Sequence, residues 1–353
     1  MPHLRRFFRP PSRRGARIPL GRFAGRPSLS CCKSPASGDL EHLNLYGYRE
    51  ASANIFFREI KEPIIQLDTS SKFRVSNIDK VIISKGRAFL LDKTKKKLVS
   101  YDLGSGKPVC LYGRKGRAGN EYLQITGFDV DSRGNVWILD SQGDKLLKYN
   151  RDGHYISKVD MSFDAIDVKC VDDDKFLLAV LPSGKMSKSK DRIILCDNEL
   201  NNKSSILLYE GNFDVNTVLS TSSFSFYEDG SLLCNNLYID DNVYKIDFSG
   251  KVQREYHIDF GKMSFPINYR KDITAHQNEI ENYRCVCPPI KITDSYCIGN
   301  MFNKGLCSFF IADRNEKKLY VSDVETAYCL VGFDSENALF FSAESEKLFA
   351  LHL

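Results

Sequence analysis

The stretch that decides the fold is Ile125–Asp160, ITGFDVDSRGNVWILDSQGDKLLKYNRDGHYISKVD. It contains short apolar runs rich in β-branched and aromatic residues, and turn-forming residues separate them. These runs are Gly127–Asp131, Val136–Asp140, Lys145–Asn150 and Tyr155–Asp160. Successive hairpins of this kind make a four-stranded antiparallel sheet. Because so small a sheet cannot cover both of its faces, the pattern predicts further copies packed beside it.

The preceding segment contains such a copy. RAFLLD (Arg87–Asp92) aligns with VWILD, and KLVSYD (Lys97–Asp102) aligns with KLLKYN. The matched residues Asp92 and Asp140 are 48 residues apart, near the upper end of the spacing of propeller blades. Six blades of roughly 45 residues would occupy nearly all of the chain as one domain.

The segment Gly113–Asp140, GRKGRAGNEYLQITGFDVDSRGNVWILD, resembles the inter-blade loop and following blade of NHL-type propellers. It is similar, more closely, to the six-bladed β-propeller family of Bacteroides-type bacteria, many of them predicted lipoproteins without assigned chemistry. The resemblance covers Ile78–Asp160 and continues beyond it mainly as strand spacing. It implies an all-β, six-bladed β-propeller with four-stranded antiparallel blades and a place in the cell envelope, periplasmic or anchored to the outer membrane.

The remaining blades follow from strand spacing. We expect blade three at Ala165–Tyr209, blade four at Ser222–Asp259, blade five at Pro289–Asp323 and blade six from Ala327. The chain ends too soon for a fourth strand in blade six, so an N-terminal strand, Ile64–Leu67, is predicted to complete that blade. An inter-blade insertion with a short helix is expected near residues 260–286. Residues 41–353 are therefore predicted to form a single propeller domain.

Residues 1–40 are predicted to be a disordered basic segment outside this domain. They contain eight Arg and Lys33 against one acidic residue, Asp39, and they hold six of the twelve prolines. The segment carries +8 and the whole chain +5, which leaves −3 for residues 41–353. Since the folded part is not basic, nucleic acid is not an expected partner. No apolar run is long enough to span a bilayer.

Three interpretations of this segment stay open. Its composition fits a transit peptide, although its prolines would break the amphipathic helix. Charge alone would fit a nucleic-acid-binding arm. The third interpretation rests on Leu29–Ser34, LSCCKS, which resembles the end of a bacterial lipoprotein signal with Cys31 or Cys32 as the acylated residue. Arg-rich sequence stands where the apolar part of such a signal belongs, so we expect the upstream residues to reflect a wrong start or a frame error.

Several patterns invite a chemical interpretation and favour a structural one. Asp129, Asp131, Gly134 and Asp140 fall at positions 1, 3, 6 and 12 of a calcium-loop pattern, but Arg133 occupies position 5 and strands flank the loop. A hairpin turn is the preferred interpretation. Likewise, aspartates that end matched strands are expected to bind the backbone amides of the next turn.

No metal, cofactor or catalytic group is predicted. The six His are scattered, most of the eleven Cys lie within predicted strands, and the one close pair, Cys285 and Cys287, has no second pair nearby. The chain also lacks the G-x-S-x-G, H-E-x-x-H and P-loop motifs.

One charge pattern points to binding. In a propeller, the turns between the second and third strands and the crossovers between blades lie on one face, which we call the loop face. Here this face is basic and the opposite face acidic. The candidate ligand-binding residues are Lys95, Lys96, Arg114, Lys115, Arg117 and Lys188, with Glu121 and Tyr122 beside them to orient a ligand.

The predicted function is therefore a non-catalytic binding or scaffold propeller. Its partner would be a protein or an anionic ligand such as an acidic glycan, the only membrane contact would be through a lipid anchor, and a monomer is expected. The alternative is an NHL-like lyase or hydrolase that acts at the central channel. Function argued from a fold is analogy, so the site itself has to decide.

Overall fold

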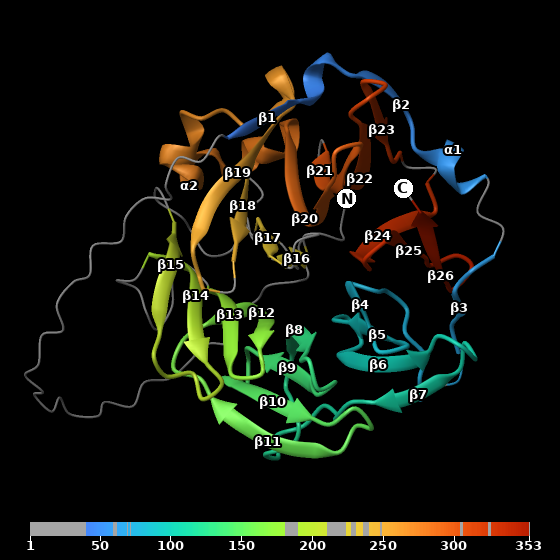
Figure 1. Ribbon diagram of the computed structural model, residues 1–353, viewed down its shortest axis with the longest axis vertical. Coiled ribbons are helices and arrows are strands. Elements are labelled where there is room, and N and C mark those ends of the chain that lie inside the picture. The colour runs from blue at the N-terminus through green and yellow to red at the C-terminus, as the bar shows by residue number, and fades with distance from the viewer. Residues whose placement is uncertain are drawn as a thin grey trace, which may run out of the picture. The chain divides into compact units, whose positions relative to one another are not determined.

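Six β-sheets follow one another along the chain and surround a central axis, as Figure 1 shows. This arrangement confirms the predicted six-bladed β-propeller. The computed structural model describes residues 40–58, 62–68, 70, 72–180, 190–209, 224–226, 231–235, 240–247, 249–303, 306–323 and 326–352. All of them belong to one compact unit, Pro35–Leu353.

Each blade is an antiparallel meander whose first strand lies innermost. The strands, blade by blade, are β4 (Lys80–Ser84), β5 (Arg87–Asp92), β6 (Lys97–Asp102) and β7 (Pro108–Leu111); β8 (Ile125–Val130), β9 (Val136–Asp140), β10 (Lys145–Tyr149) and β11 (Tyr155–Asp160); β12 (Ala165–Asp172), β13 (Lys175–Val180), β14 (Asp191–Asp197) and β15 (Ser204–Leu208); β16 (Phe224–Phe226), β17 (Leu232–Cys234), β18 (Asn242–Ile246) and β19 (Val252–Asp259); β20 (Arg284–Ile292), β21 (Tyr296–Asn303), β22 (Leu306–Asp313) and β23 (Lys318–Val321); β24 (Tyr328–Phe333), β25 (Asn337–Ser342), β26 (Lys347–His352) and β3 (Ile65–Gln66).

Apolar side chains on the faces of the blades form the cores between neighbouring blades. Leu139 of β9 lies opposite Leu146 of β10, and both pack against Phe176 of the next blade. Trp137 joins the same cluster, with its ring 4.7 Å from that of Phe176 in an edge-to-face contact. The alternating apolar positions thus face a neighbouring sheet, which is why one blade requires the next.

The N-terminal strand β3 closes blade six, as predicted. It pairs antiparallel with β26, and the amides of Ile64 and Leu67 donate to the carbonyls of Leu348 (2.8 Å) and Glu346 (3.0 Å). Strands from both ends of the domain therefore share one sheet. This pairing covers a strand edge that would otherwise be open.

The same N-terminal segment contributes two strands that the sequence analysis did not predict. β1 (Glu41–Asn44) and β2 (Arg49–Ser52) run parallel to β19 and β23 and form fifth, outermost strands of blades four and five. Only Leu43 among their residues is buried. Backbone pairing and ion pairs at the edge, such as Arg284 to Glu50 at 2.9 Å, hold these strands in place of an apolar face.

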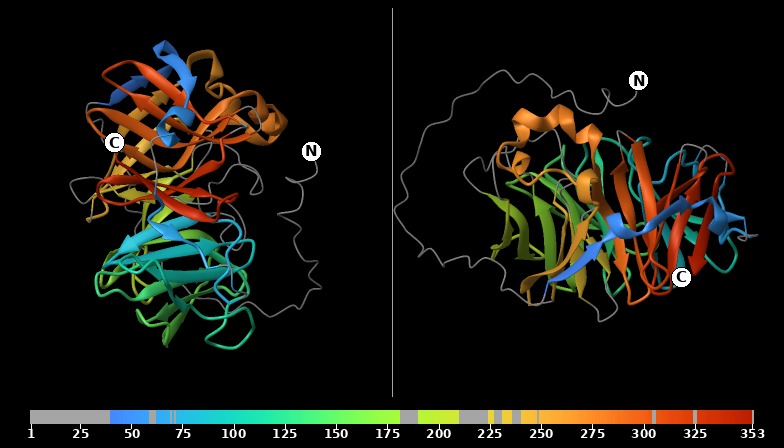
Figure 2. Two further views of the ribbon diagram at one scale, coloured as in Figure 1. Left: turned by 90° about the vertical axis from the view of Figure 1, so that its right-hand side faces the viewer. Right: turned by 90° about the horizontal axis from the view of Figure 1, so that it is seen from above.

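The insertion occupies residues 260–283 between blades four and five. It contains η3 (Gly261–Met263), η4 (Tyr269–Lys271), α2 (Ile273–His276) and η5 (Gln277–Asn282), which lie on one face of the propeller in Figure 2. An ion pair between Arg270 and Asp241 fastens it to blade four.

The predicted start of blade five, Pro289, was wrong because β20 begins at Arg284. Cys285 and Val286 are buried and pair with β21, and a shift of register between Cys287 and Ile290 accommodates the prolines. Proline is tolerated at such an irregularity, so it does not mark the start of a strand.

The innermost strands approach one another too closely for side chains at two points. A Cβ atom on Gly127 of β8 would lie 2.6 Å from Oδ1 and 2.9 Å from Cα of Asp167 in β12. A Cβ atom on Gly332 of β24 would lie 2.6 Å from the carbonyl oxygen of Val81 in β4. Glycine at these positions sets the spacing of the blades around the axis.

We expect Gly332→Ala to lower the free energy of unfolding by about 1–3 kcal/mol, because the added methyl group meets backbone that has little freedom to move. The midpoint of urea denaturation measures the effect. Gly119→Ala is the matched control, since no atom lies within 4 Å of its Cβ position. Equal midpoints for the two variants would contradict the close approach of β24 and β4.

Candidate functional site

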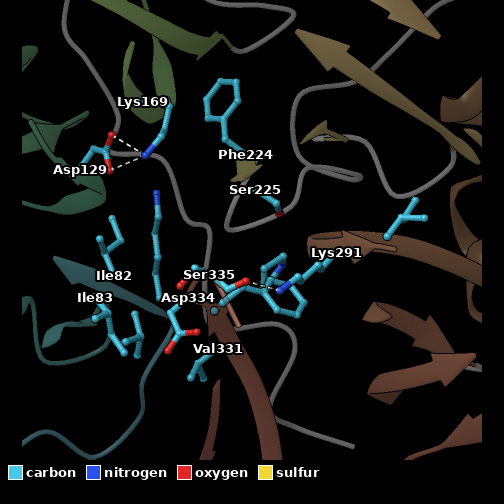
Figure 3. A pocket seen from close by; sticks show the side chains of 16 residues that line it. Ile82, Ile83, Asp129, Lys169, Phe224, Ser225, Lys291, Val331, Asp334 and Ser335 are labelled. Atoms are coloured by element: carbon cyan, nitrogen blue, oxygen red, sulfur yellow. Dashed lines mark hydrogen bonds and ion pairs between the residues drawn. The ribbon is translucent and has the colours of Figure 1, made fainter. Parts of the chain in front are cut away.

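The innermost strands enclose a cavity of about 570 Å³, and each of the six contributes lining residues. Figure 3 shows part of this lining. These strands run from the loop face towards the opposite face, and the cavity includes Asp334 and Ser335 in the turn after β24. The cavity therefore reaches the end of the channel at the opposite face. Its volume is within the range of small-molecule sites.

Two buried lysine–aspartate pairs form one side of the channel. Nζ of Lys80 in blade one passes β8, donates to the carbonyl of Phe128 at 3.0 Å, and reaches Asp167 in blade three at 3.0 Å. Nζ of Lys169 in blade three reaches Asp129 in blade two at 2.9 Å. Both pairs cross between blades, and their side chains are at least nine-tenths buried. They bind the innermost strands of blades one to three together.

Backbone amides complete the surroundings of these carboxylates. Asp129 accepts a hydrogen bond from the amide of Cys170 at 2.7 Å, and Asp167 accepts one from the amide of Val168 at 3.0 Å. Lys93, in the turn after β5, approaches the same region from the loop face. Burial lowers the pKa of Lys93, and the nearby carboxylates of Asp167 and Asp79 oppose that shift.

The other side of the cavity carries one cation and one carboxylate that do not form a pair in the part of the chain described. Nζ of Lys291 donates to the carbonyl of Ser335 at 2.9 Å. The Asp334 carboxylate caps its own turn and accepts the amides of Glu336 at 2.8 Å and Asn337 at 2.6 Å. Within the described residues, the Lys291 ammonium group therefore has a neutral carbonyl as its hydrogen-bond acceptor and no carboxylate partner.

Apolar side chains fill the remaining lining. Ile82 and Ile83 come from β4, Phe224 from β16, and Val331 and Phe333 from β24. The cavity thus combines charged groups with an apolar wall, a combination typical of sites for small amphipathic molecules.

The predicted loop-face residues do not line this cavity, and part of the set has a structural role. Tyr122 is 1% exposed and its hydroxyl donates to the carbonyl of Lys96 at 3.0 Å. Nζ of Lys96 donates in turn to the carbonyl of Leu123 at 2.9 Å. Tyr122 therefore holds the crossover between blades one and two, and the expectation that its side chain orients a ligand at the surface was wrong.

Glu121 is also engaged within the crossover. Its carboxylate accepts the Ala118 amide at 2.9 Å and Nε of Arg114 at 2.6 Å, and these two hydrogen bonds lower the pKa of Glu121. A Cβ atom on Gly116 would overlap the same carboxylate. The glycine at this position makes room for the Glu121 side chain within the crossover.

The exposed members of the predicted set are Lys95, Arg114, Lys115 and Arg117. Their role in ligand binding stays a prediction. Lys188, Cys31 and Cys32 lie outside the described residues.

Two aspartates of the calcium-like pattern, Asp131 and Asp140, cap backbone amides, whereas Asp129 pairs with Lys169. Asp131 accepts the Asn135 amide at 2.7 Å and the indole N–H of Trp137 at 3.2 Å. Asp140 accepts the amides of Leu123 and Gln124, both at 2.9 Å. Asp92, 48 residues earlier, binds crossover amides in the same way. The hairpin-turn interpretation is confirmed.

Three further findings concern the described residues. They contain no group of three or more His, Cys, Asp or Glu side chains placed to hold a metal ion. Burial raises the pKa of Cys285 to about 12 and also raises that of Cys287, so both thiols stay protonated near neutral pH. Within the same part of the chain, no helix has the length and apolar character needed to cross a membrane.

Fold and cavity together define the protein as a six-bladed β-propeller with an axial pocket. Its sequence matches the family described as "Domain of unknown function (DUF4934)" over residues 50–348, so the chain belongs to that family. None of the curated proteins compared with the chain matches it.

Solved structures share the fold at low sequence identity. A protein of Bacteroides fragilis NCTC 9343 that is predicted to be exported is 14% identical, with a TM-score of 0.68 over 85% of this chain and 88% of that one. A member of the DUF4221 family from Bacteroides vulgatus ATCC 8482 is 12% identical, with a TM-score of 0.54 over 83% and 97%. These likenesses confirm the predicted propeller and its similarity to Bacteroides proteins, whereas NHL-type repeats and lipidation stay predictions.

The lysine–aspartate pairs give a test of the channel geometry. Lys80→Met should lower the free energy of unfolding by about 3 kcal/mol or more, because it leaves a buried carboxylate without its partner. Arg133→Ala removes an exposed pair with Asp173 and should cost about 1 kcal/mol or less. Urea denaturation compares the two. Similar losses would mean that the channel pair is hydrated and weak.

Proposed function

We propose that this propeller is a binding module that takes a small ligand into the axial cavity. The observation that carries the proposal is a cavity lined from all six innermost strands, so that a rigid scaffold places every lining group. Close packing of those strands at Gly127 and Gly332 supports the rigidity. Preformed concave sites of this size lose little entropy when a ligand enters.

The hydrogen bonds and ion pairs that the lining carboxylates already make favour binding over a lyase or hydrolase reaction. A general base needs a carboxylate within reach of the substrate proton. Asp129 is paired with Lys169 and accepts a backbone amide, and Asp334 caps its turn through both oxygens. Groups used in this way hold the scaffold, and their internal hydrogen bonds would have to break before they could accept a proton.

Filling the cavity gives the test. Ile83→Trp places a bulky indole ring into the channel from β4, and Ser335→Trp places one there from an exposed turn at the rim. Ligand-observed NMR with a library of small fragments should detect binding to the native protein and a loss of most of it in either variant. The matched control is Ile156→Trp on the outer strand β11, where Ile156 is 49% exposed.

Two results would contradict the proposal: no fragment binds the native protein, or the same fragments bind all three variants equally. Thermal denaturation of each variant checks that it is folded. Because the two cavity variants enter from different elements, a folding defect in one leaves the other informative.

A second candidate function, recognition of an anionic ligand or a protein partner on the loop face, has a separate observation in its favour. Arg114, Lys115 and Arg117 are exposed on one crossover, which the buried Tyr122 and Glu121 fix in shape. Charges of one sign on a fixed loop steer anions. For this candidate function we also propose that the partner is an acidic glycan or a protein, that the protein is a monomer, and that it is located in the cell envelope.

Heparin chromatography over a salt gradient tests this candidate on protein lacking residues 1–40. Each exposed contact is worth only about 1 kcal/mol, so Arg114, Lys115 and Arg117 are replaced by Ala together. This triple variant should elute at clearly lower salt. Replacing Lys85, Lys107 and Lys158 by Ala removes the same charge from elsewhere and should shift elution less. Equal shifts for the two triple variants would mean that retention depends on net charge and not on this crossover.

A further inference from the structure

We propose that the axial cavity binds a small organic carboxylate with an apolar body, anchored by Lys291. This inference rests on the proposed binding function and adds the chemical class of the ligand.

The balance of donors and acceptors carries the first step. A lysine ammonium group has three N–H donors. The described residues give Lys80 two acceptors, Phe128 O and Asp167 Oδ1, and give Lys291 one, Ser335 O. Hydrogen-bond capacity therefore remains on both cations.

The carboxylates of the lining have no comparable surplus. Asp129 accepts Lys169 at both oxygens and the Cys170 amide as well. Asp334 accepts two backbone amides and the side-chain amide of Asn337. Because donors are in surplus, a complementary ligand must bring acceptors.

The charges identify the anchor and the sign of the ligand. Lys80 and Lys169 each have a carboxylate partner within 3.0 Å. Lys291 is half-buried, and within the described residues it donates to a neutral carbonyl. The other unpaired charge among the described residues of this wall, the Asp334 carboxylate, already accepts the amides of its own turn, so Lys291 is the charge that remains open to a ligand with one negative charge. A dianionic phosphate would leave excess charge away from water, which is costly.

The rest of the ligand follows from the apolar wall. Ile82, Ile83, Phe224, Val331 and Phe333 line the same cavity as Lys291. Figure 3 shows Lys291 beside Ser335, with Val331 and the isoleucines of β4 also at the cavity. Burying an apolar body there gains about 25 cal/mol per Å² of contact, while a polar body would lose its hydration without partners. An aromatic or branched aliphatic acid fits both requirements.

Isothermal titration with three probes that share one apolar body tests the inference: 4-phenylbutyrate, its neutral amide and the corresponding amine. We expect the carboxylate to bind the native protein at least about tenfold more tightly than the amide, and the amine most weakly. A charge-assisted hydrogen bond at Lys291 accounts for the difference.

Three variants locate the effect. Lys291→Met should bring carboxylate affinity down to that of the amide and leave the amide unchanged. Lys291→Arg should keep the preference for the carboxylate. Lys107→Met removes a lysine from an exposed turn outside the cavity lining and should change neither affinity.

The possible failures separate the two proposals. Equal binding of amide and carboxylate, or a preference that survives Lys291→Met, would overturn the carboxylate class and leave cavity binding intact. If no probe binds although other fragments bind the cavity in the Ile83→Trp comparison, the class is likewise wrong. If those fragments do not bind either, the proposed binding function is wrong as well.

Discussion

The close approach of six innermost strands around one axis is the constraint on which the rest of this structure depends. At Gly127 and Gly332 the neighbouring strand leaves no room for a Cβ atom. Charged groups on strands so close together are largely removed from water, so each needs a partner within the protein. Lys80 and Lys169 find theirs on neighbouring blades, which makes the same ion pairs both a cost of burial and a link between blades.

This constraint is met differently on the two sides of the channel. Blades one to three use the lysine–aspartate pairs. Near the channel, the described residues of blades four to six are linked by neutral groups: Ser225 accepts the Ile290 amide at 2.8 Å, and Asn300 donates to the Leu330 carbonyl at 3.0 Å. Neutral links need no opposite charge beside them. The wall there can be apolar, and Lys291, the one cation that blades four to six contribute to the described lining, stands in surroundings where a carboxylate from outside would be its strongest partner.

The fold was predictable because its signal is local and repeated. Each blade buries both faces of a meander, so apolar runs and turns recur with a period of 48 residues in the first two blades. Strand β3 was predictable because the C-terminal segment supplies only three strands of blade six, which leaves a place for a fourth. β1 and β2 were not predictable, because parallel pairing at an edge through backbone groups requires no apolar alternation, and EHLN and REAS show none. The prolines before Ile290 led to a wrong start for blade five for a related reason. An irregular pairing inside a strand has no characteristic amino-acid composition.

The site was harder to predict because its partners are distant in sequence. Lys80 and Asp167 are separated by 87 positions, and nothing in their spacing connects them. The charged residues that were predicted for the site lie in turns and crossovers, and one of them, Glu121, accepts hydrogen bonds within its own crossover. A usable signal did exist: Lys80, Asp129, Lys169 and Lys291 are charged residues of innermost strands that are otherwise rich in apolar residues. In a propeller such a strand faces either a neighbouring sheet or the channel, and a charge is tolerated only towards the channel. Charges within first strands are therefore more informative about a propeller's axial site than charges in its loops.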